Sequence, residues 1–131
     1  MANPNIVSVA SIYAESVGWN LSNTLTATLL TVAADVVIKI NFIQVSNVDG
    51  TSSADLDLYV DKATFTSAGA VATSPATSTL YLAKTIAVPA DAAIVILSSP
   101  LYLMETDVLK GGASAASDLD LFISYEVIND A

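Results

Sequence analysis

The chain has 131 residues and a formal net charge of −9, with four lysines and no arginine, histidine or cysteine. This composition excludes disulfides, thiolate metal sites, histidine-based acid–base catalysis and the basic surface that nucleic-acid binding requires. The length fits one domain, and the hydrophobic share of 53% exceeds that of an ordinary soluble domain. Such an apolar small domain also fits burial between subunits.

The N-terminal region predicts neither a cleaved signal peptide nor a membrane anchor. Residues 1–11 contain no basic residue ahead of an apolar core. Polar residues interrupt the longest apolar window, residues 29–45, so it is not expected to span a membrane. Residues 1–5 are a candidate N-terminal arm, and residues 5–14 predict a strand that is free to pair with a neighbouring molecule.

Apolar residues then recur with the period of a β-strand. Residues 23–30 alternate apolar side chains with threonine, which predicts a half-buried strand. Residues 36–46 begin with apolar side chains at even positions and then change to Ile43 and Val45. A shift of one residue is what a β-bulge produces, so we expect a bulge near Phe42 and Ile43.

Turns and loops separate the remaining predicted strands. Residues 47–53 predict a turn, and the small, polar residues 64–78 predict a surface loop insertion. Residues 92–97 are apolar on both faces, which favours a central strand that is covered on both sides. The other expected elements are strands at 79–88, after Pro100, at 108–110 and from about Asp118 to Ile128, with turns at 105–107 and 111–114.

About eight short strands without a helical period predict an all-β fold. The expected architecture is a single antiparallel β-sandwich over residues 1–131, of the Ig-like or jelly-roll kind. The many β-branched residues and the few strong helix formers favour the same fold class.

The sequence Asp-Leu-Asp-Leu occurs twice, at residues 55–58 and 118–121. Alternate residues of a strand share a face, so each aspartate pair lies opposite its leucine pair. Because Asp-x-Asp opens many calcium loops, a shared site is one hypothesis if both segments lie at the same end of the sandwich. Its weak calcium candidates are Asp55, Asp57, Asp118 and Asp120.

The rest of the calcium-loop pattern is missing. Counted from Asp55, the fifth, sixth and twelfth positions should be an oxygen donor, glycine and glutamate. The chain has Tyr59, Val60 and Thr66 there. We therefore expect two strand starts, each with a solvated acidic face and a leucine core face, and no bound metal or other cofactor.

The sequence predicts no catalytic site. It contains no Ser-x-x-Lys motif, no P-loop and no Gly-x-Gly-x-x-Gly. Thirteen acidic residues make some carboxylate pairs unavoidable, so such pairs do not indicate a glycoside hydrolase. We expect a protein that is not an enzyme.

Four aromatic residues, Tyr13, Trp19, Tyr59 and Phe122, are candidates for an interface. Trp19, with Tyr13 near it in the sequence, is either an exposed anchor for a partner or sugar, or a core residue that closes one end of the sandwich. Tyr59 and Phe122 are predicted on the same faces as the aspartates. There they are either half covered by a loop or directed at a neighbouring subunit.

Residues 86–109, IAVPADAAIVILSSPLYLMETDVL, combine a VPAD entry into an apolar strand with a YL-x-E-x-D corner. Further motifs are a Met-Ala-Asn-Pro start, SIY at 11–13, SNVDG at 46–50 and SYE at 124–126. In these motifs and their order, the chain resembles small virion structural proteins of tailed bacteriophages, especially marine and cyanobacterial phages. Two features depart from them: Thr106 stands at a position that is usually glycine, and residues 64–78 look like an insertion.

The resemblance implies a head decoration or cement protein that stabilises the capsid by oligomeric packing, or else a neck- or tail-associated protein. The expected partners are copies of itself and the major capsid or neck proteins, with no nucleic acid and no membrane. The expected location is the virion, after synthesis in the host cytoplasm. The acidic composition agrees with such a location, because the phosphates of packaged DNA would repel an acidic protein. The competing class is a receptor- or glycan-binding module built on Trp19 and the loop.

Overall fold

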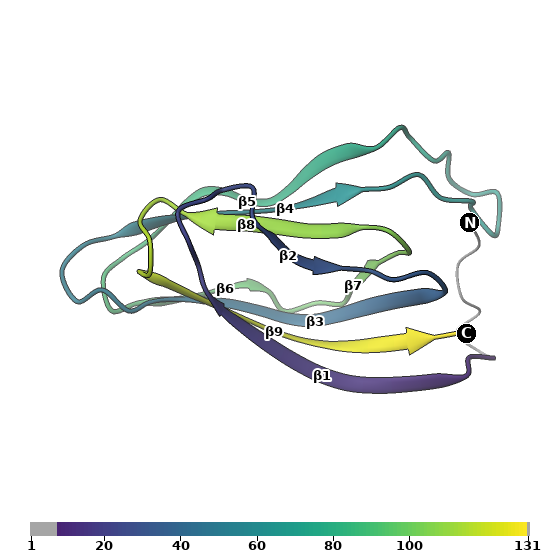
Figure 1. The fold of residues 1–131 in the computed structure, drawn as a ribbon, viewed down its shortest axis with the longest axis horizontal. Coiled ribbons are helices and arrows are strands. Elements are labelled where there is room, and N and C mark those ends of the chain that lie inside the picture. Colours follow the sequence, from purple (N-terminus) through teal and green to yellow (C-terminus); the bar gives the residue numbers. More distant parts are fainter. Residues whose placement is uncertain (1–7, 131) are drawn as a thin grey trace.

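The computed structural model of the protein describes residues 8–130, which form two antiparallel β-sheets packed face to face (Figure 1). One sheet has the order β1-β9-β3-β6, with β7 also pairing with β3, and the other has the order β2-β8-β4-β5. The all-β sandwich predicted from the sequence is therefore present, with nine strands. The strands are β1 Ser11–Asn20, β2 Thr28–Thr31, β3 Val36–Asn47, β4 Ala54–Lys62, β5 Ser78–Val88, β6 Ala93–Leu97, β7 Leu101–Leu103, β8 Val108–Ala113 and β9 Leu119–Asn129.

The predicted N-terminal arm, residues 1–5, lies outside the described residues. Residues 63–77 connect β4 to β5 without regular structure, where the sequence predicts a loop over residues 64–78. Within residues 8–130, no helix has the length and hydropathy that crossing a membrane requires.

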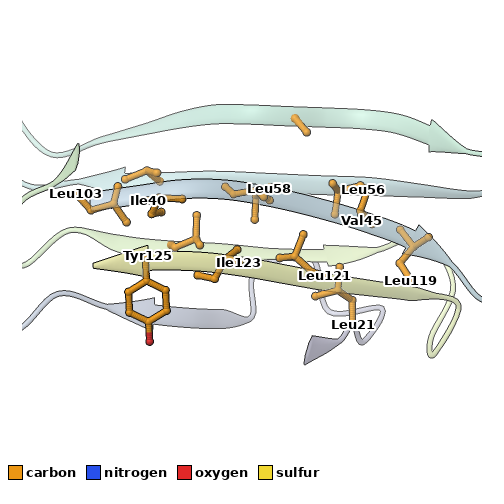
Figure 2. Close-up of a cluster of buried hydrophobic side chains, with 14 of the residues drawn as sticks. Leu21, Ile40, Val45, Leu56, Leu58, Leu103, Leu119, Leu121, Ile123 and Tyr125 are labelled. Carbon is orange, nitrogen blue, oxygen red and sulfur yellow. The ribbon is translucent and has the colours of Figure 1, made fainter. Parts of the chain in front are cut away.

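A single apolar core fills the space between the sheets (Figure 2). The leucines of both Asp-Leu-Asp-Leu segments belong to it: Leu56 and Leu58 come from β4, and Leu119 and Leu121 come from β9. Each is fully or almost fully buried, and burial of a leucine side chain contributes roughly 1.5–3 kcal/mol. The core facing predicted for these leucines is confirmed.

The predicted bulge in the third strand is also confirmed, one residue earlier than expected. The pairing of β3 with β9 changes register between Ile40 and Phe42. Ile38 and Ile40 are buried before the change, and Ile43 and Val45 are buried after it. The extra residue thus keeps apolar side chains directed at the core along the whole strand.

Two local predictions from the sequence are wrong. Residues 92–97 are not a central strand, because β6 lies at a sheet edge and Val95 is 51% exposed. Residues 111–114 do not form a turn, because Gly111–Ala113 continue β8. The glycines are needed for close approach: a Cβ on Gly112 would lie 2.5 Å from the carbonyl oxygen of Thr24.

The first two strands also differ from their predicted bounds. Residues 23–27 are largely exposed and precede β2, which covers only Thr28–Thr31. The first strand extends to Asn20 and pairs along its whole length with β9 of the same chain. Trp19 therefore lies within an edge strand, partly buried against the core.

Candidate interaction surface

The two aspartate pairs lie on opposite outer faces of the sandwich. β4 and β9 begin at the same end of the molecule but in different sheets (Figure 1). Since their leucines are directed at the shared core, their aspartates are directed away from one another. The shared calcium site considered for Asp55, Asp57, Asp118 and Asp120 is therefore not formed.

Two of these aspartates have structural hydrogen bonds instead. The Asp57 carboxylate accepts the backbone N–H of Thr85 at 2.8 Å, beside the register shift between β4 and β5. The Asp120 carboxylate accepts the side-chain amide of Asn20 at 2.6 Å. Within residues 8–130, no three acidic side chains gather where they could hold a metal ion.

Removal of divalent cations is expected to leave the melting temperature nearly unchanged, because the part of the chain that the structure describes has no carboxylate cluster for them to neutralise. The measurement is thermal unfolding in excess EDTA, with added calcium as the second arm. A fall of about ten degrees or more that calcium reverses would show that the folded state binds the ion.

The YL-x-E-x-D corner is organised by Asp107, which is fully buried. Its Oδ2 lies 3.1 Å from Nζ of Lys62 and accepts the backbone N–H of Met104 at 2.8 Å. Its Oδ1 accepts the backbone N–H of Ala63 at 2.9 Å. One carboxylate thus joins the β7–β8 turn to the end of β4 and the first residue of the long loop.

The residue before Asp107 keeps the conformation that glycine would favour. Thr106 has a φ of 66°, in the left-handed region. Its backbone N–H donates to the carbonyl of Val32 at 3.0 Å, while the Glu105 carboxylate accepts the N–H of Asp35 at 2.5 Å. Threonine at this position is therefore compatible with the left-handed backbone conformation that the corner requires.

The SNVDG and VPAD motifs meet through Asn47, a second buried polar residue. Its side-chain amide donates to the carbonyl oxygens of Ser52 and Val88, each at 2.9 Å. Its side-chain oxygen accepts the N–H of Asp49 at 2.9 Å. Both motifs thus hold turns in place, and the sequence pattern alone did not reveal this role for Asn47.

Tyr59 offers little surface to a partner. It is only 7% exposed, and the Tyr81 ring on β5 lies against it with the ring centroids 5.1 Å apart. Tyr81 is the exposed ring of this pair, and Lys84 Nζ lies 4.7 Å from its centroid. The mixed alternation of residues 79–88 in the sequence is the pattern that could have indicated Tyr81.

Trp19 and Phe122 lie on neighbouring strands β1 and β9, where Trp19 pairs with the core residue Leu121 and Phe122 pairs with Gly18. Phe122 is 49% exposed on the outer face, whereas Trp19 is half-buried and packs against the core. A Cβ on Gly18 would lie 3.3 Å from the Phe122 ring, so glycine makes room for this ring. A shallow hollow of about 390 Å³ lies here, lined by Gly18, Trp19, Asn20, Asp120, Leu121 and Phe122.

A second, more apolar groove lies between β5 and β7, at the opposite edge of the sandwich. Its volume is about 240 Å³, and its exposed members are Leu80 and Tyr102. Tyr13 lies apart from both hollows, near the start of β1, where it and Ile12 are each 56% exposed. The four aromatic candidates therefore do not form one site.

All four lysines are engaged within the molecule. Besides the Lys62–Asp107 pair, Lys39 lies 3.7 Å from Glu126, and Lys110 lies 2.8 Å from Asp61. The hydrogen bond from Lys110 lowers the pKa of Asp61, and the same bond raises the pKa of Lys110. Lys84 lies over the Tyr81 ring and is the one lysine without an acidic partner among the described residues, so few cations are available for ion pairs with another copy.

A partly buried side-chain hydrogen bond adds to the backbone pairing between the edge strand β1 and β9. The Tyr125 hydroxyl donates a hydrogen bond to the Glu15 carboxylate at 2.9 Å. Burial, followed by this carboxylate, raises the pKa of Tyr125 above its usual value.

A stability loss at alkaline pH is expected from this pKa. The stabilisation from the protonated Tyr125 hydroxyl is fully present below the pKa of an unfolded tyrosine, about 10. It is lost as the pH rises through the higher pKa that Tyr125 has in the folded protein. Tyr125→Phe should therefore lose less stability than the parent between about pH 8 and about pH 11 in urea unfolding. Tyr13→Phe, an exposed tyrosine on the same edge strand, is the control. Equal losses in the parent and Tyr125→Phe would contradict the assignment.

The described surface thus presents separate apolar patches, a strongly acidic charge and no reactive cluster. Comparison of the chain with family models, with curated proteins and with solved structures found no match in any of the three.

Proposed function

We propose that the protein is a structural protein of a tailed-bacteriophage virion, where it decorates and stabilises the head as a repeated subunit. The distribution of its exposed apolar side chains is the observation that carries this proposal. Neighbouring exposed apolar side chains mark contact surfaces, and the chain has more than one such group, for example Ile12 with Tyr13 on β1 and Leu80 with Tyr102 at the groove between β5 and β7. The exposed apolar side chains lie on both sheets, on edge strands and on loops: Ile12, Tyr13, Leu25, Val48, Val71, Leu80, Tyr81, Ile86, Val95, Tyr102 and Phe122.

The net charge of the chain also favours apolar contacts over ion pairs between copies. A net charge of −9 keeps the protein away from packaged DNA and makes its own copies repel one another. Because the chain has only four lysines and three of them are already paired with carboxylates, apolar contact has to overcome that repulsion. It contributes roughly 25 cal/mol per Å² of buried apolar area, less the cost of association.

The resemblance of residues 86–109 to phage virion proteins supports a place in the virion. A neck- or tail-associated position would rely on the same apolar contacts. The receptor- or glycan-binding alternative rests on the hollow beside Trp19 and Phe122. That alternative is less favoured because Trp19 packs against the core and leaves Phe122 as the exposed ring.

Co-sedimentation with capsids of the encoding phage that lack this protein tests the proposal. Binding should hold or tighten as salt rises, because salt screens the repulsion between acidic surfaces. Phe122→Ser should weaken binding if the outer face of the β1–β9 sheet contacts the capsid, whereas Ser124→Ala on the same strand should not. A protein that never binds such capsids, or that binds a defined glycan on an array, would overturn the decoration role. Loss of binding in high salt would instead assign the contact to a basic partner surface.

A further inference from the structure

The edge of the sheet formed by β1 offers regular, unpaired backbone groups. All ten residues of β1 pair with β9 without a register shift, and no described strand pairs with its other side. The N–H of Leu21 donates to the carbonyl of Leu119, its partner in the same register, at 2.8 Å. Because hydrogen-bonded pairs alternate in an antiparallel ladder, odd-numbered residues of β1 bond to β9. The N–H and C=O groups of Ile12, Ala14, Ser16, Gly18 and Asn20 therefore point outward.

This edge lacks most of the features that usually prevent edge-to-edge pairing. Such features are short length, charged side chains (lysine above all), proline and bulges. β1 has ten residues, no lysine, no proline and no bulge, and its single charged side chain is Glu15. The other long edge strand, β5, carries Lys84, and its pairing with β4 is irregular beside Thr85, whose φ is 52°. The remaining described edges are the short strands β2, β6 and β7.

We propose that β1 pairs antiparallel with β1 of a second copy, about a twofold axis at Ser16, so that one sheet continues through two molecules. The β1–β1 pairing would supply one contact between the repeated subunits of the proposed function, and it rests on that function in this respect alone. A second copy is the favoured occupant because β1 is the long edge without lysine, and antiparallel pairing of β1 with itself about Ser16 keeps its one charged side chain, Glu15, away from its own copy. Glu15 already accepts the Tyr125 hydroxyl.

The residues of β1 select this register. An axis at Ser16 uses almost the full strand and places Ala14 opposite Gly18 of the second copy. Glu15 then faces a valine, Val17. Moving the axis by one residue to Glu15 would place two carboxylates directly opposite each other, which is destabilising.

Cysteine cross-linking tests the pairing directly, because the chain has no cysteine of its own. Residues of a hydrogen-bonded antiparallel pair have Cα atoms about 5.5 Å apart, within the range that a disulfide bridges. Mild oxidation should convert most Ser16→Cys protein to a covalent dimer. Ser124→Cys is the matched control, because Ser124 is the β9 partner of Ser16, one strand further from the edge. Equal dimer yields from the two variants would overturn the proposal.

Ser16→Pro is the second test, since it removes the outward N–H and leaves the bonds to β9 in place. Its self-association, measured by analytical ultracentrifugation, should be about tenfold weaker or more, with Ser16→Ala unchanged. If the proline variant fails to fold, Ser16→Glu replaces it, with Ser124→Glu as the control. Unchanged association in the folded variant would overturn the edge pairing.

The two proposals fail separately. A chain that binds capsids without the Ser16→Cys cross-link keeps the virion role and overturns the pairing. A chain that cross-links but never binds capsids keeps the pairing and overturns the virion role.

Discussion

Asp107→Ala is expected to lower the free energy of unfolding by about 3–5 kcal/mol, because it leaves a partly buried ammonium without its partner. The Asp107 carboxylate is fully buried, and it accepts two backbone N–H groups in addition to the Lys62 ion pair. The substitution would strand these donors at the junction of the β7–β8 turn, β4 and the long loop. Urea unfolding followed by circular dichroism measures the loss.

Asp61→Ala is the matched control for Asp107→Ala. Asp61 also pairs with a lysine, at 2.8 Å from Lys110, but both side chains are partly exposed. Water can replace an exposed partner, so this variant should lose much less stability. Equal losses of unfolding free energy in the two variants would mean that burial does not determine how much the Asp107–Lys62 pair stabilises the fold.

Leu121→Ala is expected to cost about 2–5 kcal/mol, the range for removing a buried leucine side chain. Leu121 is 1% exposed and lies between the sheets among the other core leucines (Figure 2). Asp120→Ala should cost far less, because Asp120 is exposed and its bond to Asn20 lies at the surface. If both variants melted at the same urea concentration, the facing assigned to β9 would be wrong.

The fold class and the facing of several strands could be predicted because burial imposes a period of two on the sequence. The Asp-Leu-Asp-Leu repeats show this clearly: each leucine pair is in the core and each aspartate pair is outside. The bulge in β3 was predictable for the same reason, since the apolar positions change parity there.

Other features depend on neighbours that are distant in the sequence. Gly112 is in a strand because β8 pairs with β4 there, and it is glycine because the chain at Thr24 passes close to it; local turn chemistry carries no record of either neighbour. Residues 92–97 form an edge strand although their composition resembles a central one, because strand order depends on pairing with β3. The pairing of Asp107 with Lys62 joins residues that are 45 apart, so spacing alone did not predict it.

The aromatic candidates show the same limit at the surface. Alternation placed Tyr59 on the outer face of its strand, but it is almost buried because Tyr81 on the neighbouring strand covers it. Phe122 remains exposed because its neighbour on the β1 side is Gly18, which adds no side chain beside it. Exposure on a sheet thus depends on the cross-strand partner as much as on the period of two.

Reconstruction of the encoding phage particle is the measurement that tests the virion role most directly. The proposal predicts density for a nine-stranded sandwich at symmetry-related positions on the outside of the head, in contact with the major capsid protein. Density at the neck or tail would keep a virion role and move its site. Particles that contain no copy of the chain, by density and by mass spectrometry of their proteins, would contradict the central claim.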